Sequence, residues 1–169
     1  MVIRKKYAKP ISYNSKKRDR KKIKAIVIHY TGNVGDTAIN NATYFATTNT
    51  RYAGAHFFID KKGEVVKSVP MNKIAYSVGG MLYNNLGGKY YTIYNNDNTV
   101  SIELCDCTKK EPYNIKEIKQ LKKLIKYIRK YCPNAKKIIR HYDVNGKNCP
   151  MPLINDYEWK KFLTMLGEK

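Results

Sequence analysis

Short apolar runs alternate with amphipathic stretches along this chain of 169 residues. Residues 25–30 read Ala-Ile-Val-Ile-His-Tyr, and such a nearly continuous apolar run is typical of a strand buried on both faces of a sheet. The same criteria predict further strands over residues 55–60, 64–68, 99–105 and 137–141. Gly63 is expected to supply the positive φ angle of a hairpin between residues 55–60 and 64–68.

Three stretches have the apolar spacing of helices. Asp36 is expected to cap the first, in which Ile39, Ala42, Phe45 and Ala46 recur at helical spacing. The second follows Asn114 and covers residues 115–131, with an apolar stripe on one side and mostly Lys and Arg on the other. The third begins at Asn155 and carries Trp159, Phe162 and Leu166. Strands that alternate with helices predict an α/β fold, a single domain with a central mixed β-sheet flanked by helices.

The remaining segments lack a clear period. Residues 1–24 are crowded with Lys and Arg and are interpreted as a basic N-terminal arm laid over the domain formed by residues 25–169. Residues 78–98 are rich in Gly, Asn and Tyr and predict a long surface loop, a kind of segment that often carries function. Residues 142–152 are expected to form a second loop.

The net charge of +20 predicts attraction to a polyanion, which nucleic acid, an anionic membrane or a phosphate-bearing cell wall would each satisfy. No apolar run approaches the roughly 18 residues of a membrane span, and no secretory-type apolar stretch follows the basic start. The chain is therefore expected to be made in the cytoplasm without a signal peptide. In that reducing compartment its four cysteines are expected to be metal ligands or small buried side chains rather than disulfides.

Two histidines and one cysteine form a candidate metal site. His29 and His141 fall at predicted strand ends, and Cys149 follows His141 within one loop. Two imidazoles and a thiolate suit tetrahedral zinc and leave the fourth position open, which is the catalytic arrangement. His56 is a rival ligand, and Cys105 with Cys107 is a rival pair that lacks a second Cys-x-x-Cys partner.

Four ordered segments together resemble the zinc-dependent N-acetylmuramoyl-L-alanine amidases, a family that includes phage endolysins and is related to peptidoglycan recognition proteins. The segments are residues 26–32, which contain His29, 53–65, which contain His56, 100–105, which contain Glu103, and 140–150, which contain His141, Lys147 and Cys149. The likeness spans about residues 25–165, and four motifs in order are far more specific than any one of them.

The resemblance implies a role for each matching residue. It implies that His29, His141 and Cys149 bind zinc, that Glu103 and Lys147 act in catalysis, and that His56 lies beside the site without binding the metal. Some members place a catalytic tyrosine just before that histidine, whereas this chain has Ala55, so the role of the base falls on Glu103. The implied substrate is the amide between N-acetylmuramic acid and L-alanine of the peptidoglycan stem peptide.

Substrate contacts are expected from His56 and from loop tyrosines of residues 78–98, above all Tyr91 and Tyr94, since tyrosine offers sugars and peptides an apolar face and a polar tip. Tyr83 and Tyr90 belong to the same loop and could share that role. The same tyrosines could instead cover the core.

Two non-enzymatic alternatives remain open at this point, a peptidoglycan-recognition module and a basic nucleic-acid-binding protein. Recognition-only relatives typically lack the cysteine ligand, whereas this chain keeps Cys149. No RNA- or DNA-binding motif accompanies the charge, so no nucleic-acid partner is expected. The expected partner is bacterial peptidoglycan with its anionic wall polymers, approached by a monomer that reaches the wall through a phage holin or acts outside the cell.

Overall fold

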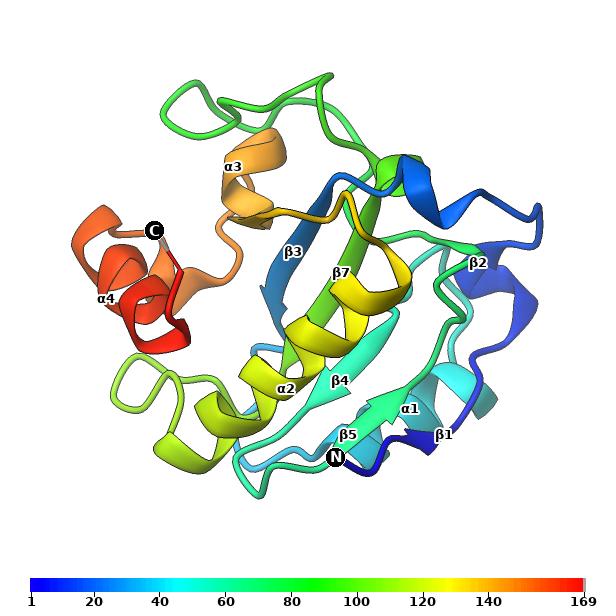
Figure 1. Ribbon diagram of the computed structural model, residues 1–169, viewed down its shortest axis with the longest axis horizontal. Coiled ribbons are helices and arrows are strands. Elements are labelled where there is room, and N and C mark those ends of the chain that lie inside the picture. The colour runs from blue at the N-terminus through cyan, green and yellow to red at the C-terminus, as the bar shows by residue number, and fades with distance from the viewer. Residues whose placement is uncertain (169) are drawn as a thin grey trace.

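The computed structural model describes residues 1–168, and a six-stranded mixed sheet forms its centre (Figure 1). The strands follow the order β1-β5-β4-β7-β3-β8. Their bounds are Arg4–Lys5 for β1, Ala25–Tyr30 for β3, Phe57–Ile59 for β4, Val65–Lys67 for β5, Thr99–Leu104 for β7 and Lys137–Arg140 for β8. A separate two-stranded sheet pairs β2 (Tyr13–Asn14) with β6 (Ile74–Ala75) in antiparallel fashion.

The helices lie on both faces of the large sheet. They are α1 (Ala38–Thr47), α2 (Ile115–Tyr131), α3 (His141–Asn145) and α4 (Asp156–Leu166), with short 3-10 turns at Pro10–Ser12, Arg20–Lys22, Asn96–Asn98 and Met151–Leu153. In Figure 1, α2 crosses the front of the sheet and α1 lies behind it. None of the helices over residues 1–168 is long and apolar enough to cross a membrane.

Alternation along the central strands separates a core face from a polar face. Val100, Ile102 and Leu104 of β7 pack in the main core with the apolar stripe of α2 and with α4. Ser101 and Glu103 point to the opposite face, as the period of two along a strand requires. The site described below therefore lies on the face of the sheet that α2 does not cover.

Most of the predicted elements are confirmed. Strand β3 has the predicted bounds, and the other predicted strands differ from β4, β5, β7 and β8 by one or two residues at an end. Strands β4 and β5 form the expected antiparallel hairpin, in which Gly63 has φ +77°. Asn114 and Asn155 cap α2 and α4, each by accepting hydrogen bonds from backbone N–H groups of the first turn.

Two local predictions were wrong. Thr37, not Asp36, caps α1, because the Thr37 hydroxyl accepts from the amide of Asn40 at 3.2 Å. The Asp36 carboxylate instead accepts from the Asn41 side chain at 2.7 Å and from the backbone of Asp106. Residues 142–152 are not a plain loop, since α3 occupies residues 141–145 and a 3-10 turn occupies residues 151–153.

The basic N-terminal segment lies along the domain and pairs with it. Strand β1 adds parallel to β5 at the sheet edge, and β2 pairs with β6. Arg18, although charged, is only 8% exposed. These contacts fit an arm laid over the domain, and they bring one of its side chains next to the candidate site.

Candidate metal centre and the cleft around it

Parallel strands β3 and β7 place His29 and Glu103 side by side. The register pairs His29 with Glu103, so both side chains leave the same face of the sheet near the carboxyl ends of their strands. His29 is 2% exposed. A buried apolar strand thus positions a polar side chain at its end, where a rigid scaffold meets loops.

Strand β8 and helix α3 position the other two metal-ligand candidates. His141 is the first residue of α3. The amide of Tyr142 donates to the carbonyl of Cys149 at 2.8 Å, which folds the following loop back onto the helix. Gly146 ends α3 with φ +78°, and a Cβ there would meet the Asn84 carbonyl oxygen at 2.6 Å, so glycine allows this return.

The buried guanidinium of Arg140 holds the same loop through hydrogen bonds. Arg140 is 2% exposed and donates to both carboxylate oxygens of Asp143, at 2.7 and 3.1 Å. It also donates to the carbonyls of Leu153 and Ile154, at 3.1 and 2.6 Å. These bonds join α3 to the segment after Cys149, so the two ligand candidates of this region are held by one network.

His29, His141 and Cys149 converge in the structure. Their candidate ligand atoms all lie within 4.8 Å of one another, and His29 Nδ1 is 3.7 Å from Cys149 Sγ. All three residues are buried. Within residues 1–168 this is the only group of three or more His, Cys, Asp or Glu residues found close enough to hold a metal ion.

The protonation of these groups suits a cation. His29 Nε2 and both ring nitrogens of His141 are buried without a hydrogen-bond partner among the described residues. Burial lowers the pKa of His29 well below its ordinary value and that of His141 to about 3, so both rings are neutral and can offer a lone pair. Burial raises the pKa of the Cys149 thiol, a cost that a bound cation would reverse by favouring the thiolate.

Glu103 lies beside this cluster and is a candidate base. Its Oε2 atom is buried and has no hydrogen-bond partner among the described residues. Burial raises the pKa of Glu103 to about 7, against the opposing effect of the Lys147 charge. A carboxyl group with a pKa near neutrality can both accept and return a proton at physiological pH.

Two pockets flank Lys147 and form the open side of the site. One has a volume of about 530 Å³ and is lined by Glu103, Asp36 and Arg51 among others. The second, of about 350 Å³, is lined by His141 and by Tyr52, Tyr76 and Tyr83. Lys147 and Ala53 line both pockets, so the two are joined into one cleft across the candidate metal site.

His56 lies inside a hydrogen-bonded network rather than on the cleft surface. It is 1% exposed, its Nδ1 lies 3.0 Å from the Ser101 hydroxyl, and its Nε2 lies 2.8 Å from Arg18 Nη2. Arg18 also donates to the carbonyls of Met71 and Asn96, at 3.0 and 2.8 Å. Sequence reasoning missed Arg18, because one arginine within a basic run carries no distinguishing signal.

The tyrosines singled out for substrate binding are not brought to this cleft. Tyr94 is 8% exposed and packs with Val27 and Val144. Tyr91 is exposed but lines neither of the two pockets around Lys147. Their contact with substrate stays a prediction. The cleft is lined by Tyr83, which was expected to share that role, and by Tyr52 and Tyr76.

The other cysteines lie apart from the candidate metal site. Cys105, Cys107 and Cys132 are free thiols buried in the apolar clusters of the molecule. Among residues 1–168 neither Cys105 nor Cys107 belongs to the metal-binding group. The structure therefore places the rival pair, Cys105 and Cys107, outside the candidate metal site.

Comparison with known families agrees with this arrangement. The profile of the family described as N-acetylmuramoyl-L-alanine amidase matches residues 19–152, most of the chain. The chain belongs to this family. The matched stretch of the amidase family includes His29, Glu103, His141, Lys147 and Cys149.

Curated relatives and solved structures extend the comparison. The N-acetylmuramoyl-L-alanine amidase CwlL of Bacillus licheniformis is 30% identical over 157 residues, which cover 87% of this chain and 42% of that protein. BlyA of Bacillus subtilis (strain 168), with the same description, is 30% identical over 141 residues, covering 79% of this chain and 38% of that protein. The chain thus spans about two fifths of the length of these amidase relatives.

The fold is that of solved endolysin domains. The structure of PlyL superimposes with a TM-score of 0.75 at 22% identity and covers 100% of this chain and 98% of its own. The catalytic domain of XlyA gives a TM-score of 0.72 at 21% identity, with 99% and 100% covered. At this level of identity these matches establish the mixed α/β fold of the amidase family.

Proposed function

We propose that this chain is a zinc-dependent amidase that hydrolyses the bond between N-acetylmuramic acid and L-alanine in peptidoglycan. One observation carries the proposal: in a chain of the amidase family, His29, His141 and Cys149 converge within 4.8 Å, beside Glu103 and Lys147. One cleft thus gathers three ligand candidates for a cation, a carboxylate that can act as a base, and the positive charge of Lys147.

The three ligand candidates fit zinc. Two neutral imidazoles with free lone pairs and one thiol that can ionise give the nitrogen and sulfur donors that zinc prefers, with one position left open. Zinc, when bound, supplies positive charge that polarises a carbonyl group and acidifies water. The remaining chemistry belongs to the side chains of the cleft.

Glu103 is the proposed general acid and base. Its carboxylate takes a proton from the attacking water as the new C–O bond forms at the scissile carbonyl. It then returns that proton to the amide nitrogen as the C–N bond breaks, which leaves a lactyl carboxylate and a free L-alanine amine. The pKa of about 7 suits both transfers.

Lys147 is the proposed oxyanion stabiliser. It lies two residues before Cys149 and lines both halves of the cleft, so its ammonium group can approach a carbonyl bound beside the ligand candidates. The substrate would lie across the joined pockets, with Tyr52, Tyr76 and Tyr83 on one side and Arg51 on the other. His56 would support the cleft from below its surface, through its contacts with Ser101 and Arg18.

The setting proposed for the enzyme is the bacterial cell wall. Its relatives are named amidases and one structural neighbour is named an endolysin. These names support a lytic enzyme that reaches the wall through a phage holin or acts outside the cell. Anionic wall polymers are a further proposed partner, because the chain carries a net charge of +20. The chain is proposed to act as a monomer.

The test is release of L-alanine amino groups and muramic lactyl groups from purified Gram-positive cell walls. Wild type is expected to release both, a chelator to stop the release and zinc to restore it. Cys149→Ser is expected to lose activity and bound zinc, whereas Cys132→Ser, which changes a buried cysteine outside the cluster, keeps its zinc. Glu103→Ala is expected to keep zinc and lose activity.

Two outcomes would contradict the proposal. Stoichiometric zinc with intact walls would indicate a peptidoglycan-recognition module instead of an enzyme. Purified protein without zinc, together with activity that a chelator leaves unchanged, would exclude the metal mechanism.

A further inference from the structure

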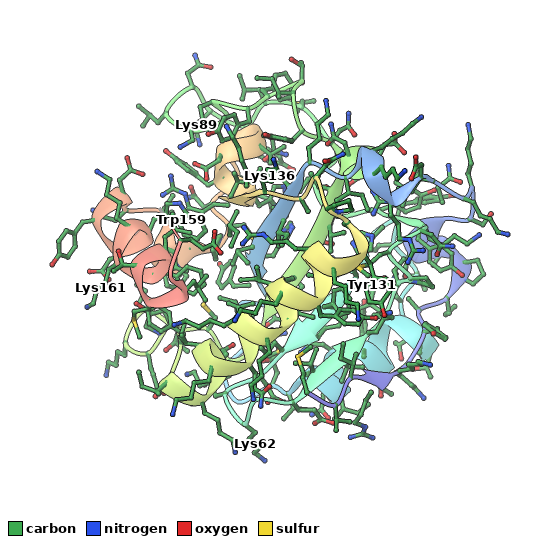
Figure 2. The ribbon with its side chains drawn as sticks, viewed as in Figure 1. Lys62, Lys89, Tyr131, Lys136, Trp159 and Lys161 are labelled. Atoms are coloured by element: carbon green, nitrogen blue, oxygen red, sulfur yellow. The ribbon has the colours of Figure 1, made fainter. Side chains whose placement is uncertain are left out.

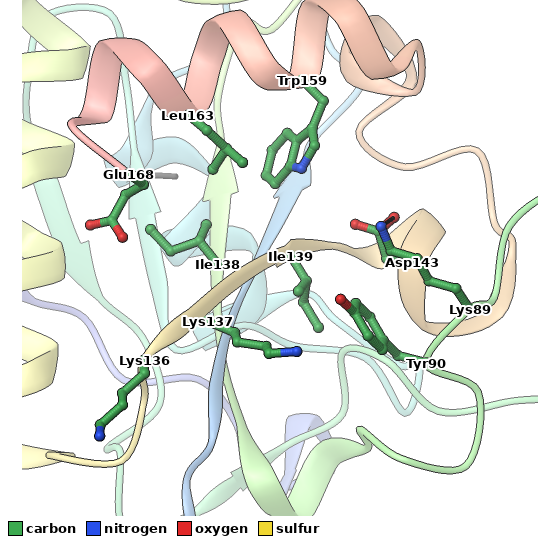
Figure 3. Close-up of a pocket in the computed structure, with 10 residues that line it drawn as sticks. All are labelled: Lys89, Tyr90, Lys136, Lys137, Ile138, Ile139, Asp143, Trp159, Leu163 and Glu168. Carbon is green, nitrogen blue, oxygen red and sulfur yellow. Dashed lines mark ion pairs between the residues drawn. The ribbon is translucent and has the colours of Figure 1, made fainter.

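A separate cavity lies at the open edge of the sheet. Its volume is about 330 Å³, and it is bounded by the long loop, β8, α3 and α4, through the residues labelled in Figure 3. Strand β8 is the last strand of the sheet and pairs with β3 alone. None of the residues that line this cavity lines the two pockets around Lys147, so the cavity is distinct from the proposed catalytic cleft. It is called the edge cavity below.

Lysine side chains at the edge cavity are held in place by an aromatic ring. The ammonium groups of Lys137 and Lys89 lie 5.0 and 5.3 Å from the centroid of the Tyr90 ring. Figure 3 shows Tyr90 between these two lysines. Cation–π attraction restrains both ammonium groups, which lowers the entropy that a ligand would otherwise have to remove. Lys136, the residue before β8, also lines the cavity and carries a third positive charge, although Figure 3 shows its side chain directed away from Tyr90.

The acidic groups of the edge cavity are already engaged. Both oxygens of Asp143 accept from Arg140, and Lys89 lies 3.4 Å from one of them. Both oxygens of Glu168 accept from Arg129, at 2.6 and 2.9 Å. Lys136 and Lys137 form no ion pair with any acidic residue between residues 1 and 168. Their charges are therefore free to meet an anion.

Trp159 contributes a neutral donor. It is 6% exposed, and its ring stacks on Phe162 and lies 5.4 Å from the Arg140 guanidinium carbon. Figure 3 shows the indole nitrogen on the side that faces Ile139 and Asp143. The groups left free in the edge cavity are thus donors and cations, the complement of an anion rich in acceptor oxygens.

We propose that the edge cavity binds the phosphoryl group of a polyol phosphate, as a unit of an anionic polymer. Lysine ammonium groups bind phosphate as point charges, and the cavity has room for a phosphate with a short polyol. A nucleotide fits less well, because base recognition needs an open aromatic face. Here the Tyr90 ring is flanked by lysines and Trp159 is almost fully buried.

The chain supplies its own probe for this site. Trp159 is the single tryptophan of the sequence, so intrinsic tryptophan fluorescence reports on the edge cavity alone. The full chain is titrated at constant ionic strength with glycerol 3-phosphate, poly(glycerol phosphate), inorganic phosphate and glycerol. A saturable change is expected with the first two, tighter per phosphate for the polymer, and none with glycerol. The measurement needs no turnover, so it is independent of the proposed amidase activity.

Matched variants locate the site. Lys136→Ala with Lys137→Ala is expected to weaken binding about tenfold or more, as loss of charge-assisted contacts does. Lys16→Ala with Lys17→Ala removes the same charge from exposed positions of the N-terminal arm, outside the edge cavity, and is expected to keep the wild-type affinity. Equal weakening in both double variants would show a response to net charge only and overturn the site.

Ligand controls decide the chemistry. A fluorescence change that sodium chloride reproduces would overturn an anion site of any kind. Binding of inorganic phosphate without binding of the polymer would assign the cavity to the free ion and overturn the polymer. Tighter binding of a single-stranded oligonucleotide than of poly(glycerol phosphate), at equal phosphate concentration, would assign it to nucleic acid instead.

Discussion

Glu103 illustrates the conflict between stability and chemistry at a single residue. Its pKa rises from an ordinary 4.5 to about 7 because the carboxyl group is buried. In metal-free protein the folded state therefore holds this proton more tightly than the unfolded state does. The stability that follows is complete below pH 4.5 and is lost as the pH rises through about 7, by roughly 3 kcal/mol.

Glu103→Gln should accordingly stabilise the metal-free protein at pH 8 and hardly change it at pH 4, while abolishing wall hydrolysis. Urea unfolding at both pH values measures the first effect, and amine release measures the second. Glu111→Gln, at an exposed position where the carboxylate pairs only with Lys61, is the control; it should change stability by less than about 1 kcal/mol at either pH and leave hydrolysis unchanged. A loss of stability in Glu103→Gln at pH 8 would show that the carboxylate is favourably paired in the fold.

Arg18, a residue of the basic N-terminal segment, affects the buried His56. Burial of His56 is the main cause that lowers the pKa of its imidazole, and the positive charge of Arg18 is the second. Arg18→Leu should raise the pKa of His56, followed by NMR of the imidazole protons, and should cost about 2–4 kcal/mol through lost hydrogen bonds to carbonyl groups. Arg20→Leu, at an exposed position nearby, should do neither.

At the scale of elements, the capping asparagines offer a comparison within one molecule. Asn155 only caps α4, whereas Asn114 caps α2 and also donates to the Lys61 carbonyl at 2.9 Å. Asn155→Ala should cost about 1 kcal/mol, the ordinary value for a helix N-cap. Asn114→Ala should cost about 1 kcal/mol more, because it also frees the β4–β5 hairpin from α2. Chemical denaturation of both variants measures the difference, and equal losses would contradict the second role of Asn114.

The elements that were predicted from sequence differ from those that were missed in whether a local pattern marks them. Strand β3 and helix α2 were predicted at their observed bounds, because a buried apolar run and an apolar stripe of helical period are local patterns. Strands β1, β2 and β6 are two residues long and exist only through partners far along the chain, so no local pattern marks them. The missed helix α3 is stabilised by the Arg140 network, which is equally non-local.

The candidate site divides in the same way. His29, His141 and Cys149 were indicated by residue type and by the resemblance of their motifs, and the structure brings them together. Of the cleft tyrosines, Tyr83 was indicated by its place in the long loop. Tyr52 and Tyr76 could not be selected from sequence, because this chain has 15 tyrosines and only the tertiary fold decides which of them line the cleft. The edge cavity had no sequence signal either, since it joins the long loop to β8 and α4.

At the scale of the whole molecule, one group of exposed lysines lies away from the cleft. Helix α2 exposes the six lysines of its outer side, and its one acidic residue, Glu117, is buried. These lysines are Lys116, Lys119, Lys122, Lys123, Lys126 and Lys130. Figure 2 shows Tyr131, at the end of this helix, on the same face as Lys62 and Lys136. The proposed catalytic cleft lies on the other face of the sheet, so the proposed attraction to an anionic wall and the proposed hydrolysis would use different surfaces.

This separation predicts that wall binding and turnover respond differently to salt. Raising sodium chloride from 0.05 to 0.5 M, as an order-of-magnitude change in ionic strength, shortens the Debye length from roughly 14 to 4 Å and should weaken binding to purified walls steeply. Replacing Lys119, Lys122, Lys126 and Lys130 of α2 by Gln should reproduce that loss at low salt and leave cleavage of a small soluble muropeptide unchanged. Co-sedimentation with walls and amine release from the soluble substrate measure the two effects separately. Salt-insensitive wall binding by the wild type would exclude the electrostatic role, and equal loss of both activities in the variant would mean that α2 supports the cleft rather than the encounter.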